Sequence, residues 1–300
     1  MIVITGATGH TGRVAAEILL AKGEKVRVLG RSAAKLLPLT TKGAEAIALD
    51  MHDEAALTAS FMGADAVYAV VPPDVTSDDV IGHYDRISEA LVAAIKASGV
   101  KHVVTLSSVG AQLREGSGPV LGLHRMEEKI NTIHHVNVLH LRPGAFMQNM
   151  LAQIPVIQRF GAVAGIIKGD VAYSMISTKD IGAVAAQTLE TRDFTGKSTR
   201  ELLGPRDVST NEAAKIIGAA IGKPELSYME APVPMFVTGL RQAGMSANMA
   251  ELIAEMMLSI SSGVQKPEEP RSARNFTPTT FESFVAEEFA PAYRGKAVSA

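Results

Sequence analysis

The sequence predicts an α/β fold with a doubly wound parallel sheet, followed by a smaller, mainly helical C-terminal region. Short β-branched runs alternate with longer helical patterns through residues 1–145, which is typical of parallel βαβ units. This alternation stops after Phe146. The composition, with 47% hydrophobic and 20% charged residues, is that of a globular protein rather than a disordered one.

The first half of the chain contains six strand-like runs with helical patterns between them. The expected strands cover residues 1–6, 25–31, 44–50, 64–71, 101–108 and 137–144. The expected helices cover residues 12–23, 53–63, 78–99 and 124–135. Two of them end at Gly23 and Gly99, because glycine accepts the left-handed conformation of a helix terminus. Six such strands fill a doubly wound sheet, so residues 1–150 are expected to form one domain of the Rossmann type.

The second half of the chain has a less regular pattern. Helical patterns cover residues 146–161, which proline interrupts, and residues 210–222, whereas residues 172–177 and 199–205 resemble isolated strands. From about residue 225 the chain is rich in Met and mostly helical. A last helix is expected to start at Thr277 and Pro278, because proline is favoured in the first helical turn. We expect residues 151–300 to form a substrate-binding region that returns in part to the sheet.

Charge and composition exclude several classes of function. The chain has 29 basic and 31 acidic residues, a net charge of −2, so we expect neither a nucleic acid nor a membrane surface as partner. It contains no Cys, which excludes disulfides and thiol nucleophiles and is compatible with a reducing, cytoplasmic location. We expect no secretory signal and no membrane span. The His residues lack ligand-like spacing, so no metal site is expected.

A glycine-rich turn joins the first expected strand to the first expected helix. Gly6, Gly9 and Gly12 follow the strand in the sequence ITGATGHTGRV, residues 4–14. A dinucleotide pyrophosphate needs backbone N–H groups aimed at it from a helix N-terminus, and glycine leaves room for that approach. The turn therefore predicts cofactor binding by Gly6, Thr8, Gly9, His10, Thr11, Gly12 and Arg13.

Residues after the second strand favour NADP(H) over NAD(H), although NAD(H) stays possible. An acidic residue there would bond the ribose 2′-hydroxyl, whereas basic residues accept a 2′-phosphate. The chain has no acid at this point but has Arg31, Ser32 and Lys35, and Arg13 adds a second positive group. The alternative is that these are ordinary solvated charges. Further cofactor contacts are expected at the ends of the next two strands, from Asp50, Met51, Val71 and Pro72. For Asp50 the alternative is a structural role beside a helix N-cap.

Four segments together resemble the NmrA-like group of atypical short-chain dehydrogenases. They are the glycine turn, HVVTLSSVGA at residues 102–111, LRPGAFMQNML at 141–151 and STKDIGAVAAQTL at 177–189. This group includes NADPH-dependent quinone oxidoreductases, triphenylmethane-dye reductases and NADP-sensing regulators. The resemblance implies that Ser107 and Ser108 lie under the nicotinamide. It also implies that the nicotinamide pocket is walled by Pro143, Gly144, Ala145 and Phe146.

The chain departs from typical short-chain dehydrogenases at their catalytic dyad. Those enzymes carry Tyr-x-x-x-Lys, in which the Lys lowers the pKa of the Tyr so that the phenol can donate a proton. Here His124 stands at the Tyr position and Glu128 at the Lys position. Lys129 is one residue late, and one residue rotates a side chain by about 100° around a helix, so it cannot replace the missing Lys.

The missing dyad favours one class of hydride acceptor. A ketone becomes a basic alkoxide that needs a proton donor, whereas a quinone, azo dye or cationic triarylmethane becomes a delocalised and far less basic product. We therefore predict hydride transfer from NAD(P)H to a flat conjugated acceptor, with His124 as a candidate proton donor or, alternatively, an ordinary structural His. Substrate contacts are expected from Phe146, Met147 and Asn149. The alternative function is a non-catalytic NADP-binding redox sensor, and a sugar-nucleotide epimerase ranks below both.

Overall fold

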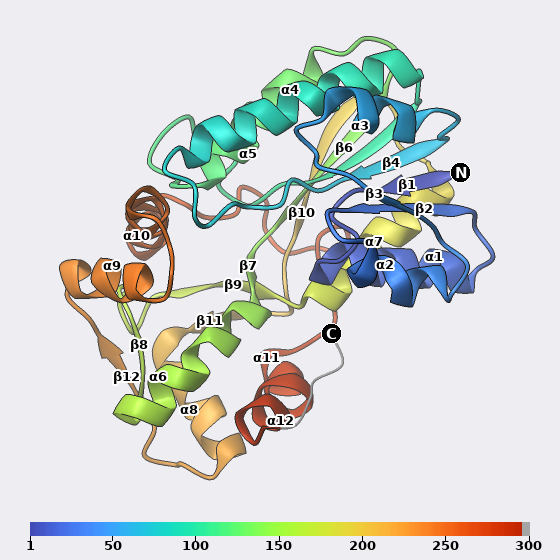
Figure 1. Cartoon of the computed structure of the whole chain (residues 1–300). Helices are drawn as coiled ribbons and strands as arrows, with labels where there is room; N and C mark the ends of the chain where they lie inside the picture. The colour runs from blue at the N-terminus through green and yellow to red at the C-terminus, as the bar shows by residue number, and fades with distance from the viewer. Residues whose placement is uncertain (296–300) are drawn as a thin grey trace.

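The computed structural model describes residues 1–295 and contains a seven-stranded sheet in which every neighbouring pair is parallel (Figure 1). The strand order is β10-β6-β5-β4-β1-β2-β3, a doubly wound arrangement that confirms the predicted fold class. The strands are β1 (Ile2–Ile4), β2 (Val26–Gly30), β3 (Glu45–Ala48), β4 (Ala66–Ala69), β5 (His102–Leu106), β6 (Asn137–Pro143) and β10 (Lys197–Leu202). The prediction of an isolated strand at residues 199–205 was wrong, because β10 pairs with β6 along its whole length and extends the sheet.

Helices cover both faces of this sheet (Figure 1). One face carries α3 (Glu54–Phe61), α4 (Val80–Ser98) and α5 (Val120–Asn131), and the other carries α1 (His10–Ala21), α2 (Ala33–Thr40) and α7 (Thr178–Thr191). Helix α2, which has Pro38 in its interior, was not predicted from the sequence. Gly182 allows α7 to approach α1 closely, because a Cβ there would lie 2.6 Å from the Cβ of Val14.

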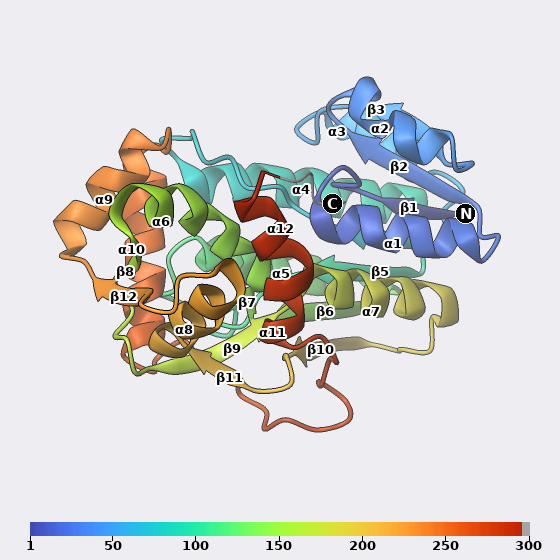
Figure 2. The same ribbon diagram turned by 90° about the horizontal axis from the view of Figure 1, so that it is seen from below.

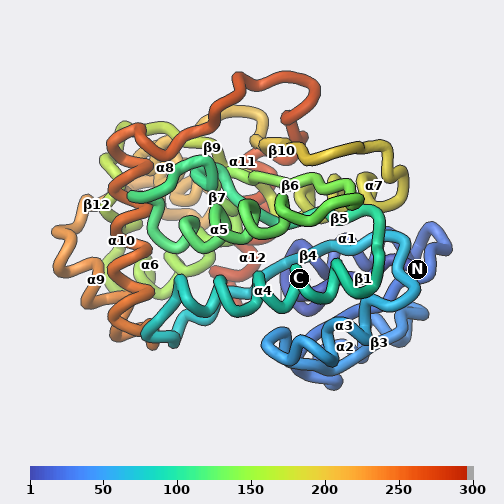
Figure 3. Tube along the Cα trace, turned by 90° about the horizontal axis from the view of Figure 1, so that it is seen from above, coloured from blue at the N-terminus to red at the C-terminus, as the bar shows by residue number. Residues whose placement is uncertain are grey.

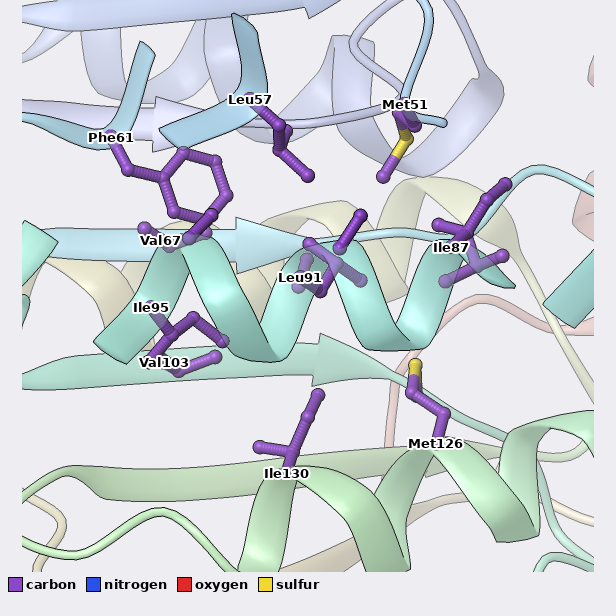
Figure 4. Packing of buried hydrophobic residues seen from close by; sticks show 14 of the residues in the cluster. Met51, Leu57, Phe61, Val67, Ile87, Leu91, Ile95, Val103, Met126 and Ile130 are labelled. Atoms are coloured by element: carbon purple, nitrogen blue, oxygen red, sulfur yellow. The ribbon is translucent and has the colours of Figure 1, made fainter. Parts of the chain in front are cut away.

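Two buried clusters fill the space between the sheet and its helices. Figure 4 shows the cluster on the α3–α4–α5 face, where Phe61, Leu91 and Ile130 come from three different helices and pack with Val67 and Val103 of the sheet. All five side chains are buried. Burial of this apolar area, at about 25 cal/mol per Å², is the main force that holds the helices on the sheet.

The remaining elements form a smaller lobe beside the carboxyl ends of the strands (Figure 2). Its strands are β7 (Ala145–Phe146), β8 (Ala162–Gly165), β9 (Ala172–Ile176), β11 (Asp207–Ser209) and β12 (Ser227–Glu230), arranged as sheets β11-β9-β7 and β12-β8. Its helices are α6 (Ile154–Phe160), α8 (Thr210–Ile221), α9 (Val233–Gln242), α10 (Ala247–Ser261), α11 (Phe281–Phe284) and α12 (Ala290–Tyr293). A 3₁₀ helix covers Met147–Gln153 and a π-helical turn covers Val285–Phe289.

The last quarter of the chain is mostly helical, as predicted, with a helix-free stretch at residues 262–280. One expectation for this part of the chain was wrong. The last helical region begins at Phe281 rather than at Thr277 and Pro278, because the Thr280 side chain accepts the N–H of Ser283 and caps the helix there. Within residues 1–295, none of the helices combines the length and the apolar character that crossing a membrane requires.

Candidate functional site

The glycine turn has a backbone shape that requires glycine. Gly6 has φ +59°, and a Cβ at Gly12 would lie 2.6 Å from the Gly6 carbonyl oxygen, closer than real Cβ contacts allow. Thr5 fixes the start of the turn, because its Oγ1 donates to the Val70 carbonyl at 2.9 Å and accepts the Val70 N–H at 2.7 Å. Thr5 was not among the predicted site residues, although it connects the turn to the end of β4.

The turn delivers the chain to a helix N-terminus that is free to bind an anion. Gly9 is the N-cap residue of α1, no side chain caps the helix, and its first turn contains no acidic residue. The first N–H groups of a helix have no partner within the helix, and they attract negative charge. Thr8, Gly9 and His10 are exposed, whereas Thr11 and Gly12 are buried. This arrangement fits a pyrophosphate group.

Arg13 and the residues after β2 lie at the edge of this turn. The Nε of Arg13 is 3.2 Å from Glu17 Oε1. Arg31 and Lys35 are exposed, and Ser32 is the N-cap residue of α2 without a side-chain capping bond. The structure therefore leaves these hydroxyl and cationic groups available to a ligand beside β2.

Asp50 and Met51 follow β3 and point in different directions. The Asp50 carboxylate accepts the backbone N–H of His52 at 3.0 Å and lies 2.8 Å from its Nδ1. These two hydrogen bonds lower the pKa of Asp50, and the positive charge of Arg31 adds a smaller effect in the same direction. Met51 is buried, and its side chain packs in the hydrophobic cluster of the α3–α4–α5 face (Figure 4).

A cavity of about 720 Å³ lies at the carboxyl ends of β4, β5 and β6. Its opposite wall comes from β9, from α10 and from residues 263–271. Figure 3 shows α10 beside one end of α4 and α5, where the Gly118 backbone contacts α10. The structure brings eight of the expected site residues to this cavity: Val71, Ser107, Ser108, Pro143, Gly144, Ala145, Phe146 and Asn149.

Other expected residues lie off the cavity. Pro73 lines it rather than Pro72, whose carbonyl lies 3.0 Å from His83 Nε2. Met147 is buried in the hydrophobic core of the smaller lobe, where it packs with residues such as Met175.

His124, the candidate proton donor, does not line the cavity. Its Nδ1 is 2.8 Å from the Ala111 carbonyl oxygen, so this nitrogen carries a proton and donates it. Its Nε2 lies 3.4 Å from Glu128 Oε2, one helical turn along α5. Nδ1 is thus committed to the backbone and the ring lies off the cavity, so the geometry favours the structural interpretation of this His.

A buried ion pair that was not predicted from the sequence lies behind the end of β5. Arg142 donates to both carboxylate oxygens of Glu127, from Nε at 3.0 Å and from a terminal nitrogen at 2.7 Å. Ser107 donates its hydroxyl proton to the same carboxylate. Burial alone would lower the pKa of the Arg142 guanidinium. The hydrogen bonds and charge of Glu127 have the larger effect, so the pKa is raised. The pair therefore fixes the rotamer of Ser107 at the cavity wall.

Signals for this pair are present in the sequence. Arg142 lies in an otherwise largely apolar strand, NVLHLRP, and a buried strand cation requires a partner. Glu127 lies seven residues after Val120, which places both on one face of α5. A charged residue on each of two core-facing surfaces indicates an ion pair.

Comparisons with known proteins agree with this geometry. An NAD(P)H azoreductase of Xenophilus azovorans is 28% identical over 258 residues, which cover 85% of this chain and 86% of the relative. A (4-alkanoyl-5-oxo-2,5-dihydrofuran-3-yl)methyl phosphate reductase of Streptomyces griseus is 30% identical over 224 residues, covering 75% of each chain. An NADPH-dependent quinone oxidoreductase of Escherichia coli, solved with NADPH, shares the fold with a TM-score of 0.80 and 24% identity, covering 96% of this chain and 100% of that chain.

The family model described as the NmrA-like family matches residues 1–285. This range includes all four segments on which the resemblance was based, and it contains the glycine turn and every residue that lines the cavity. The chain belongs to the NmrA-like family.

Proposed function

We propose that the protein is an NAD(P)H-dependent oxidoreductase that transfers a hydride to a flat conjugated acceptor such as a quinone or dye. The observation that carries this proposal is the cavity at the carboxyl ends of β4, β5 and β6, where dinucleotide-binding sheets place their ligands. Thr5 connects it to the glycine turn through Val70, the neighbour of the lining residue Val71. The names of the relatives, an azoreductase and a quinone oxidoreductase, support the same chemistry.

The residues of the first domain fit NADP(H). The pyrophosphate would lie against the uncapped N-terminus of α1, where a Cβ at Gly12 would collide with the Gly6 carbonyl. The 2′-phosphate would lie near Arg31, Ser32 and Lys35, and no acidic residue in the segment 30–35 opposes it. These positions favour NADP(H), with NAD(H) possible. We propose that residues 1–150 hold the cofactor and that residues 151–300 supply much of the acceptor site.

The chain contributes alignment and exclusion of water to the reaction. Bound NAD(P)H supplies the hydride from its reduced nicotinamide. Pro143, Gly144 and Phe146 form the apolar part of the wall at the end of β6, against which a flat ring can lie. Ile253, Met256 and Ile260 of α10 cover the opposite side. Holding two reactants in register converts a bimolecular step into an effectively unimolecular one, which lowers the barrier by several kcal/mol.

The position of His124 supports a conjugated acceptor rather than a simple ketone. The chain lacks the Tyr and Lys of the usual dyad, and the residue at the Tyr position is bonded to Ala111 outside the cavity. A ketone that accepts hydride without a proton donor would form a strongly basic alkoxide. A quinone delocalises the negative charge that it gains on reduction, and a triarylmethane cation loses its positive charge. Alignment is therefore sufficient for most of the rate enhancement.

The decisive experiment measures NADPH oxidation with a quinone, an azo dye and a triarylmethane cation, each repeated with NADH and without protein. We expect acceptor-dependent turnover and a preference for NADPH. Gly12→Ala should abolish cofactor binding. Gly239→Ala is the matched control, because open space surrounds this helical glycine and turnover should be unchanged. Tight NADPH binding without reduction of any acceptor would refute the enzyme and support the sensor.

A further inference from the structure

Tyr84 places a phenol at the cavity on the same wall as Ser107 and Ser108. It comes from α4, is 6% exposed, and lines the cavity. Its hydroxyl makes no hydrogen bond with any group in residues 1–295. The hydroxyl oxygen also keeps some access to solvent, because it does not belong to the fully buried side-chain oxygens that lack a partner. Tyr84 lines the cavity and is otherwise buried, which indicates that its hydroxyl opens onto the cavity.

Packing between α4 and α5 holds the Tyr84 ring in place. The ring lies against Gly122 of α5, where a Cβ would come within 2.5 Å of Tyr84 Cγ and 2.7 Å of its Cβ. The neighbouring His83 ring meets it edge-on at 6.0 Å between centroids. Glycine at position 122 is therefore needed to admit the ring, and Tyr84 is held by the same helix pair that frames the cavity.

The other hydroxyl groups of this wall have no proton to offer a ligand. Ser107 donates to Glu127, and Ser108 donates to the Val109 carbonyl at 2.9 Å. Both therefore present lone pairs, whereas Tyr84 has an uncommitted proton. Burial raises the pKa of Tyr84 to about 12, so the phenol stays protonated at neutral pH.

We propose that Tyr84 is a catalytic residue whose hydroxyl donates a hydrogen bond to the quinone oxygen that gains negative charge as the hydride arrives. This role rests on the proposed function. The hydride carries two electrons from the reduced nicotinamide to the quinone, which becomes the hydroquinone monoanion while the cofactor becomes NADP⁺. Tyr84 keeps its proton, and water supplies the second proton of the hydroquinone. A donor placed where charge develops stabilises the transition state more than the ground state.

The test compares two acceptors that differ in whether hydride addition creates a charge or removes one. Hydride addition to a quinone creates negative charge, whereas addition to a triarylmethane cation neutralises positive charge and needs no donor. Tyr84→Phe should lower kcat for the quinone by about tenfold or more. The same variant should leave kcat for the triarylmethane cation and the KM for NADPH unchanged within about twofold. Removal of an unpartnered hydroxyl should also leave the fold intact.

Tyr293→Phe is the matched control, because Tyr293 belongs to α12 and does not line the cavity. It should change neither rate. Equal slowing of both acceptors by Tyr84→Phe, no effect on either, or the same quinone-specific loss in Tyr293→Phe would each overturn the role of Tyr84. Absence of any turnover by the unmodified protein would refute the proposed function itself, which distinguishes the two failures.

Discussion

Acidification should destabilise the protein through one buried histidine. His140 lies on β6 and is 1% exposed. Its Nδ1 lies 2.7 Å from Thr105 Oγ1 and its Nε2 lies 3.1 Å from Asn131 Oδ1. A neutral ring that donates from Nε2 and accepts at Nδ1 satisfies both partners, so the folded protein favours the uncharged form.

Burial lowers the pKa of His140 from 6.5 to about 4; the charge of Glu127 opposes this change, whereas Arg142 and Lys197 add to it. In the unfolded chain the ring takes up a proton near its ordinary pKa, so between these two values the unfolded state binds more protons and stability falls as pH falls. The linkage relation gives a loss of about 2 kcal/mol of unfolding free energy from pH 8 to pH 5, and about 3 kcal/mol once the pH reaches the folded pKa.

Urea unfolding at about pH 8, 6.5 and 5 measures this loss. His140→Gln should have lower stability at pH 8 but a much flatter dependence on pH across this window. His134→Gln is the control, because His134 is exposed and its substitution should leave the slope unchanged. If His140→Gln retained the slope of the unmodified protein, the assignment of the pH dependence to this ring would be refuted.

Three further substitutions test the site. Arg31→Asp should raise the KM for NADPH at least about tenfold and that for NADH less than about twofold, because only NADPH has the 2′-phosphate; equal effects in steady-state kinetics would contradict this role. His124→Phe should leave kcat for a quinone within about twofold while stability falls by about 1 kcal/mol through the lost bond to Ala111; a tenfold fall in kcat would restore His124 as proton donor. Arg142→Met should lower the unfolding free energy by about 3–5 kcal/mol, because Glu127 stays buried without its cation. In urea titrations, the double variant Arg142→Met with Glu127→Leu should recover most of this loss. An equal loss of stability in the double variant would count against the ion pair.

The parts of the fold that local patterns determine were predicted from the sequence. The strands of the main sheet up to β6 and the glycine turn depend on periodicity and on a backbone that only glycine accepts, and both are visible in a short window. The position of β10 in the sheet was missed because β10 pairs with β6, for example Lys197 with Val138. A pattern within a short window cannot show a pairing between residues so far apart in the sequence. Helix α2 was missed because Pro38 argues against a helix interior.

The site was predicted where it depends on the ends of strands and missed where it depends on side-chain direction. Ser107, Pro143 and Phe146 line the cavity because the carboxyl ends of parallel strands meet at one edge. Met51 and Met147 follow strands in the same way but point into hydrophobic cores. Which side of a short loop faces the core depends on elements that pack there from elsewhere in the chain, so proximity in sequence was not enough.

The buried ion pair also bears on which acceptor the cavity suits. An unpaired Glu127 carboxylate behind Ser107 would repel the negative charge that develops on a quinone, and in a water-poor site that repulsion would be strong. Two hydrogen bonds from Arg142 offset the charge of the Glu127 carboxylate, and the same guanidinium also lies 3.2 Å from Glu268 Oε2. With the carboxylate neutralised, the free proton of Tyr84 is the group on this wall that responds to new negative charge, and a cationic dye gains nothing from it. The ratio of quinone to dye turnover therefore depends on Arg142 as well as Tyr84, and removal of Arg142 should lower that ratio even in protein that remains folded.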